Sequence, residues 1–150
     1  MMLMEKIADD MKVAMKSGDK LRLETLRTLR AALLEKQVEK RPSGGMTPDD
    51  ETGTLISASK KRRESIDVYR QNNREDLAVQ EEKELAIIQE YLPKQLSTAE
   101  VEEIVKKIVT QVGPVTQKDF GKIMGPVMKE LKGKADGKII QECVKKFLGE

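Results

Sequence analysis

The apolar residues of this chain recur every three or four positions, and no sustained run alternates with a period of two. This spacing places apolar side chains on one face of an α-helix and is not the pattern of a half-buried strand. Aromatic residues make up only 3% of the 150 residues, whereas β-sandwiches and barrels depend on aromatic and β-branched side chains. We therefore predict an all-α protein.

Four helices are predicted in residues 1–93, separated by breaks at Gly18, at 41–45 and near Asn72. Asp19 is a suitable N-cap for the second helix, and Thr47 followed by Pro48 is typical of the start of the third. The predicted core face of the second helix consists of Leu21, Leu26, Leu29, Leu33 and Val38. Because all four helices are polar on most of their circumference, we expect an elongated helical array, with 41–45 as a mobile loop.

The segment 94–150 carries the same helix-start signal three times. Ser97 with Glu100, Thr116 with Asp119, and Asp136 alone each stand just before an apolar helical pattern, as N-caps do. Glycines end the first two helices. We predict a small three-helix bundle in residues 94–150, joined at Pro93 to an N-terminal helical domain of residues 1–93.

The composition excludes several classes of enzyme site. The chain has no histidine and a single cysteine, Cys143, which removes the commonest general acid/base, the usual zinc ligands and any intramolecular disulfide. We expect no catalytic residues, no metal site and no cofactor. Cys143 lies at helical intervals from Ile140 and Phe147, which favours a core position over a reactive thiol.

The charge is unevenly distributed along the chain. The net charge is +2, but residues 1–93 carry −1, whereas the rest has 11 Lys against 8 acids, a balance of +3. An anionic partner should therefore prefer the C-terminal part. No stretch is long and apolar enough to span a membrane, and the first ten residues turn acidic too early for a signal peptide. We expect a cytoplasmic protein.

Six lysines form a candidate nucleic-acid interface, here called the lysine strip: the first three are at helical spacing and the last three continue into the turn that follows. The lysine strip comprises Lys118, Lys122, Lys129, Lys132, Lys134 and Lys138. Such a strip can contact several phosphates of a folded RNA, although an ordinary solvated helix face has the same appearance. The absence of Arg from this part of the chain argues against base-specific recognition.

Glycines alternate with these lysines. Gly121 and Gly125 lie four residues apart on one helix face, Gly133 ends that helix, and Gly137 follows the cap Asp136 at the start of the next. A phosphate cradle is one interpretation, but the spacing is not that of a P-loop and Asp136 would occupy the site. Close packing of a neighbouring backbone against Gly121 and Gly125 is a second, and contact with a flat partner is a third.

A second basic run, 60–63, is followed by Glu64 and Asp67 at helical spacing. This spacing favours ion pairs within one helix. RNA contact is the alternative for this run.

Several segments together resemble the GatB/YqeY family. They are Tyr91-Leu92-Pro93-Lys94-Gln95-Leu96-Ser97, Gly121-Lys122-Ile123-Met124-Gly125, Lys132-Gly133-Lys134-Ala135-Asp136-Gly137-Lys138, Asp10-Met11-Lys12 and Arg27-Thr28-Leu29-Arg30-Ala31-Ala32. The likeness runs over the whole chain and is similar to that of a stand-alone bacterial protein of this family.

The resemblance implies an all-helical protein whose C-terminal domain is similar to the tail of the B subunit of tRNA-dependent amidotransferase. That enzyme amidates glutamate or aspartate mischarged on tRNA, with glutamine as the nitrogen donor, and its tail helps to hold the tRNA. Similar modules are appended to some glutaminyl-tRNA synthetases. The family therefore often carries the label of a carbon–nitrogen ligase. This chain has no Ser-Ser-Lys amidase signature and too few residues for the catalytic body, so we do not expect that activity in it.

Two functions follow as hypotheses. The first is a non-catalytic accessory that binds tRNA or another structured RNA through the lysine strip. The second is a protein–protein adaptor whose N-terminal helices recruit an aminoacyl-tRNA synthetase or amidotransferase. Methionines offer an adaptable contact for the adaptor; they are Met1, Met2, Met4, Met11 and Met15.

Overall fold

The computed structural model describes residues 2–149, without the side chain of Met2. The predicted contacts of Met1 and Met2 lie outside the described residues. Seven α-helices and two single-turn 3-10 helices occupy the described range, and no β-strand occurs in it, so the prediction of an all-α protein is confirmed. The chain divides into two compact units between Pro93 and Lys94.

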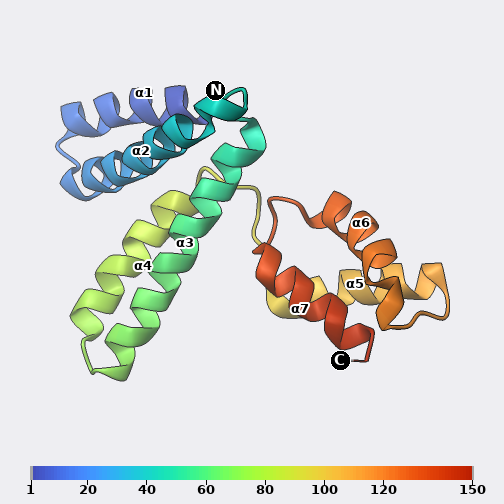
Figure 1. The fold of residues 1–150 in the computed structure, drawn as a ribbon. Coiled ribbons are helices and arrows are strands. Elements are labelled where there is room, and N and C mark those ends of the chain that lie inside the picture. Colours follow the sequence, from blue (N-terminus) through green and yellow to red (C-terminus); the bar gives the residue numbers. More distant parts are fainter. Residues whose placement is uncertain (1, 150) are drawn as a thin grey trace. The chain divides into compact units, whose positions relative to one another are not determined.

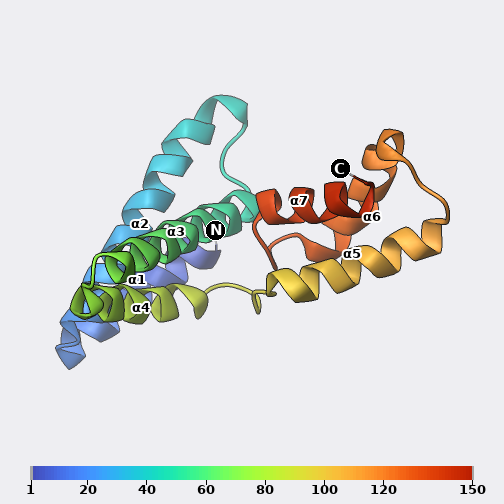
Figure 2. The same cartoon turned by 90° about the horizontal axis from the view of Figure 1, so that it is seen from below.

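The first unit consists of two helical hairpins. In it α1 (Met2–Ser17) packs along α2 (Lys20–Lys40) and α3 (Pro48–Gln71) packs along α4 (Glu75–Gln89), while α2 also contacts both α3 and α4 (Figures 1 and 2). The core of this unit is formed by Ile7, Leu26, Leu29, Leu33, Leu55, Ile88 and Tyr91. Leu21 and Val38 do not belong to it, contrary to prediction: Leu21 is only partly buried, and Val38, near the end of α2, is 56% exposed.

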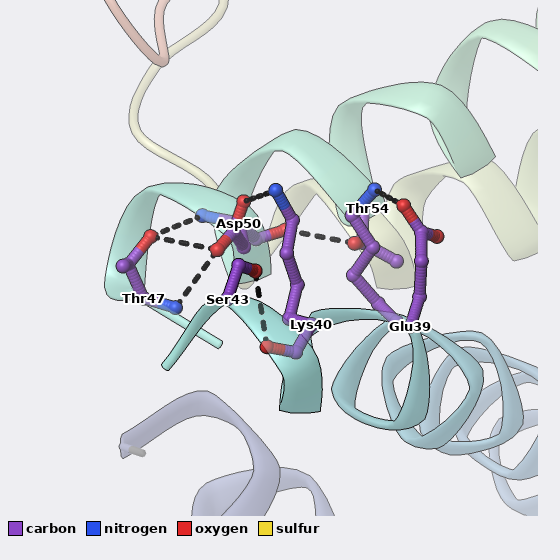
Figure 3. Close-up of polar contacts among 7 residues, drawn as sticks. Glu39, Lys40, Ser43, Thr47, Asp50 and Thr54 are labelled. Atoms are coloured by element: carbon purple, nitrogen blue, oxygen red, sulfur yellow. Dashed lines mark hydrogen bonds and ion pairs between the residues drawn. The ribbon is translucent and has the colours of Figure 1, made fainter. Parts of the chain in front are cut away.

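The segment between α2 and α3, predicted as a loop, contains the 3-10 helix η1 (Arg41–Ser43). Polar contacts hold both sides of it (Figure 3). Lys40 Nζ lies 3.4 Å from Asp50 Oδ1, and Thr47 forms a capping box with Asp50 at the start of α3. The hydrogen bonds from the Thr47 backbone and side chain, helped by Lys40, hold the pKa of Asp50 below its usual range.

The second unit is a three-helix bundle of α5 (Thr98–Val112), α6 (Phe120–Leu131) and α7 (Gly137–Phe147). The predicted caps are present: Ser97 caps α5, Thr116 caps the 3-10 helix η2 (Gln117–Asp119) that leads into α6, and Asp136 caps α7. The buried core consists of Val101, Val105, Ile108, Ile123, Val127, Leu131, Ala135, Ile140, Cys143, Val144 and Leu148.

Cys143 lies inside this core, as the sequence predicts. Its side chain is buried, and burial raises the pKa of its thiol. A thiol that stays protonated is a poor nucleophile, so Cys143 serves packing.

Candidate nucleic-acid interface

The lysine strip lies on the surface of the second unit. Lys118 lies in η2, Lys122 and Lys129 on α6, and Lys138 in the first turn of α7. The remaining two, Lys132 and Lys134, belong to residues 132–136, here called the lysine turn, which connects α6 to α7. All six side chains are exposed, so the fold presents each of them to solvent.

Few carboxylates neutralise this surface. Lys122 Nζ lies 3.6 Å from Asp119 Oδ1, whereas among residues 2–149 no carboxylate forms an ion pair with Lys118, Lys129 or Lys134. The Thr116 backbone N–H, with help from Lys122, keeps the pKa of Asp119 low. The strip therefore remains predominantly cationic at neutral pH.

Gly121 and Gly125 face open space, and the prediction of close packing against them is wrong. A Cβ added at either position would meet nothing within 4 Å. Gly125 has a local reason to lack a side chain, because it precedes Pro126 inside α6 and a Cβ before proline clashes with the proline ring in helical conformation. Gly121 has no such reason within the second unit.

Replacing Gly121 with Ala should therefore stabilise the second unit. Its backbone already has a negative φ, and Ala is favoured over Gly in a helix by up to about 1 kcal/mol. We expect the free energy of unfolding to rise by about 0.5–1 kcal/mol in chemical denaturation monitored by circular dichroism. Gly133→Ala is the matched control: Gly133 has a φ of +78°, so this variant should be destabilised. A loss of stability in Gly121→Ala would restore the packing interpretation.

The lysine turn is held by a segment that precedes α5. Gln95 Nε2 donates a hydrogen bond of 2.8 Å to the Gly133 carbonyl, and the Leu96 N–H donates one of 2.8 Å to the Lys134 carbonyl. Gln95 belongs to a segment that carries the family resemblance, but no local pattern in the sequence indicates its contact with the turn. The same contacts place the backbone of the exposed Lys94 beside the turn, which adds a candidate cation that the strip omitted.

Asp136 occupies the anion position at the start of α7, as expected. Its Oδ1 accepts a hydrogen bond of 3.0 Å from the Lys138 N–H. The carboxylate thus takes the place that a phosphate would need at this helix start. The lysine turn offers its ammonium groups to a ligand and does not form a nucleotide cradle.

Two further family-like segments meet in the first unit. The Tyr91 hydroxyl donates a hydrogen bond to Asp10 Oδ2, Lys6 Nζ lies 5.3 Å from the centroid of the Tyr91 ring, and Arg22 Nη1 lies 2.7 Å from Glu90 Oε2. These contacts join the end of the unit to α1 and α2. Their effect is to anchor the residues that lead into Pro93.

Burial and the carboxylate of Asp10 raise the pKa of Tyr91. The folded state therefore holds the phenolic proton more tightly than the unfolded state, whose pKa is about 10. The resulting stability is complete below pH 10 and declines as the pH rises toward the folded-state pKa. We expect the tyrosinate absorbance of the wild type minus that of Tyr91→Phe to titrate with a midpoint above 10. A midpoint at 10 would contradict the buried hydrogen bond.

Arg62, in the second basic run, corrects the predicted ion pairing. Its Nη1 lies 2.6 Å from Glu84 Oε2 and 3.1 Å from Glu81 Oε2, so it joins α3 to α4 instead of pairing within α3. Burial raises the pKa of Glu84, and the positive charge of Arg62 offsets part of this rise. The Arg62 side chain is only 18% exposed and is not available for RNA.

The described residues contain no group of three His, Cys, Asp or Glu side chains placed to hold a metal ion. No helix within 2–149 is long and apolar enough to cross a membrane.

The family model of the Yqey-like protein matches residues 4–148. This chain belongs to the Yqey-like protein family. The match covers both compact units and includes every residue of the lysine strip. The family resemblance drawn from the sequence motifs is thereby confirmed.

Curated relatives of this Yqey-like chain have two kinds of name. It is 28% identical to Altered inheritance of mitochondria protein 41, mitochondrial, of Pyrenophora tritici-repentis, over 98% of this chain and 81% of the relative. The protein of that name from Vanderwaltozyma polyspora is 34% identical, over 76% of this chain and 65% of the relative. A glutamyl-tRNA(Gln) amidotransferase subunit of Thermococcus sibiricus is 38% identical over 49% of this chain and 11% of the relative.

Proposed function

We propose that this Yqey-like protein is a non-catalytic accessory that binds tRNA, or another structured RNA, through its second unit. The observation that carries the proposal is the exposed cationic face of α6 and the lysine turn, beside a glycine face that nothing in the second unit covers. A positively charged surface that has no side chain at Gly121 and Gly125 suits close approach to a phosphate backbone.

The chemistry of this surface defines how it would bind. Lysine is a flexible point charge and lacks the planar fork with which arginine reads guanine. Binding is therefore expected to follow phosphate positions and RNA shape, and to weaken with salt. The similarity to an amidotransferase component named for glutamyl-tRNA(Gln) supports tRNA as the RNA class. An amidotransferase or an aminoacyl-tRNA synthetase is the protein partner that fits this role.

Titration of fluorescently labelled tRNA with the full chain tests the proposal. The dissociation constant is measured by anisotropy at salt concentrations between roughly 50 and 200 mM, where phosphate contacts have large effects. We expect log K to fall linearly with log salt. Absence of binding at the lowest salt concentration would refute the proposal. Glutamine-dependent release of ammonia by the purified chain would refute its non-catalytic part and restore the ligase label.

The adaptor hypothesis has one observation in its favour. Val13 and Met15, near the end of α1, are 64% and 59% exposed, so each apolar side chain is accessible to a protein partner. Met4 and Met11 instead pack against the core of the first unit. A pull-down that survives nuclease and is lost in the double variant Val13→Ser, Met15→Ser would favour the adaptor.

The cellular location of the protein is part of the proposal. A cytoplasmic location and a bacterial origin remain predictions, because two of the relatives carry mitochondrial names.

A further inference from the structure

We infer that Gln95 is a positioning residue for the lysine turn: its carboxamide fixes the spacing of the lysines that contact RNA phosphates. This inference rests on the proposed function and assigns a role to a residue that itself need not touch RNA. The decisive contact is the hydrogen bond from Gln95 Nε2 to the Gly133 carbonyl, which joins segments 38 residues apart in the sequence.

Three consecutive residues attach the start of the second unit to the rest of that unit. Gln95 bonds to Gly133, Leu96 packs against the core and donates its N–H to Lys134, and Ser97 caps α5. The segment is therefore firmly placed before it reaches the turn. Because the donor segment is itself held in place, its hydrogen bond restrains the turn. A donor on a mobile side chain would move with the turn and would not restrain it.

The turn itself has a backbone that needs such support. Gly133 has a left-handed φ of +78°. Lys132 and Lys134 on either side of it are exposed, so their side chains do not hold the turn by packing. Leu131 and Ala135 are buried at 0% and 7% exposure and anchor the two ends. Between these anchors, the carbonyls of Gly133 and Lys134 are bonded by Gln95 and Leu96.

The direction of these bonds matters for an anionic ligand. Carbonyl oxygens carry partial negative charge and repel phosphate oxygens. Because two successive carbonyls are engaged with donors of the same unit, they are turned toward the protein and away from the ligand. The turn is also preorganised, so less conformational entropy is lost when its lysines bind phosphates.

Gln95→Met tests the inference, because methionine is unbranched and similar in length but donates no hydrogen bond and adds no charge. Gln111→Met, at an exposed position on α5, is the matched control. We measure tRNA affinity against salt for the full chain, and amide hydrogen exchange of Leu96 and Lys134 without RNA. In Gln95→Met we expect faster exchange at both amides, an affinity about five- to tenfold lower at 0.1 M salt, and a salt slope shallower by about one phosphate contact.

The possible outcomes separate this inference from the proposed function. Faster exchange with an unchanged salt slope and affinity would overturn the positioning role and leave Gln95 a stabilising residue only. Exchange rates equal to those of Gln111→Met would show that the hydrogen bond from Gln95 to Gly133 does not hold the lysine turn. If the wild-type protein fails to bind tRNA, the proposed function is refuted, and with it the role of the turn in RNA binding. The amide exchange, measured without RNA, still shows whether Gln95 holds the lysine turn. Should Gln95→Met fail to fold, Gln95→Asn, whose shorter side chain keeps the carboxamide, gives the same comparison.

Discussion

Alanine at Lys122 and Lys134 together should lower the affinity for tRNA by about 10- to 60-fold at 0.1 M salt. Each phosphate contact contributes about 0.9 to the slope of log K against log salt, which corresponds to about eightfold at this concentration. Both side chains are exposed, and the ion pair that the described residues lose, from Lys122 to Asp119, is a surface pair that contributes little to stability. The variant should therefore fold normally and show a slope shallower by about two contacts.

Lys106 and Lys107 supply the control for net charge. Both are exposed on α5 of the same unit and lie outside the lysine strip. Alanine at these two positions removes the same charge from the chain, so nonspecific attraction falls equally. If the α5 variant loses as much affinity and slope as the strip variant, the RNA recognises overall charge and the lysine strip is not the binding site.

Leu131→Ala should destabilise the second unit by about 2–5 kcal/mol and abolish its binding to RNA. Leu131 is fully buried, and truncation of a buried leucine removes apolar contacts and leaves a cavity. A unit of about 60 residues has a stability of only a few kcal/mol. Leu131 also anchors one end of the lysine turn, whose Lys134 N–H donates to its carbonyl at 2.9 Å.

Hydrogen exchange followed by mass spectrometry measures the effect of Leu131→Ala unit by unit. Peptides from α5, α6 and α7 should lose protection while peptides from α1 to α4 keep it. Val112→Ala, at a position 48% exposed, should leave both patterns unchanged. Equal loss of protection in α1 to α4 would mean that the two units unfold as one.

Local signals in the sequence were sufficient for the helices of the second unit. Ser97, Thr116 and Asp136 each cap a helix because the capping hydrogen bonds span only two or three residues. The same locality explains the correct assignment of Gly18 and Gly133 to helix ends, where both have positive φ. Such features depend on residues that are neighbours in the chain.

Contacts between residues far apart in the chain were not predicted from the sequence, or were predicted with the wrong partner. Arg62 pairs with residues 19 and 22 positions away, and Gln95 bonds across 38, so helical spacing does not reveal either. Glu51 is 2% exposed and accepts a hydrogen bond of 3.3 Å from the Met4 N–H, 47 positions away, which no local pattern indicates. The sequence predicted that the lysines of the strip are exposed. It did not predict the contacts of Gln95 and Leu96 that hold the lysine turn.

The buried Cys143 makes this protein convenient for spectroscopy. Its protected thiol reacts slowly with maleimide dyes, since the thiolate is the reactive form. A cysteine introduced at the exposed Val13 or Val112 would thus accept a fluorophore first, with the native residue left in place. Paired dyes at those two sites would report changes in the separation of the units while RNA is added.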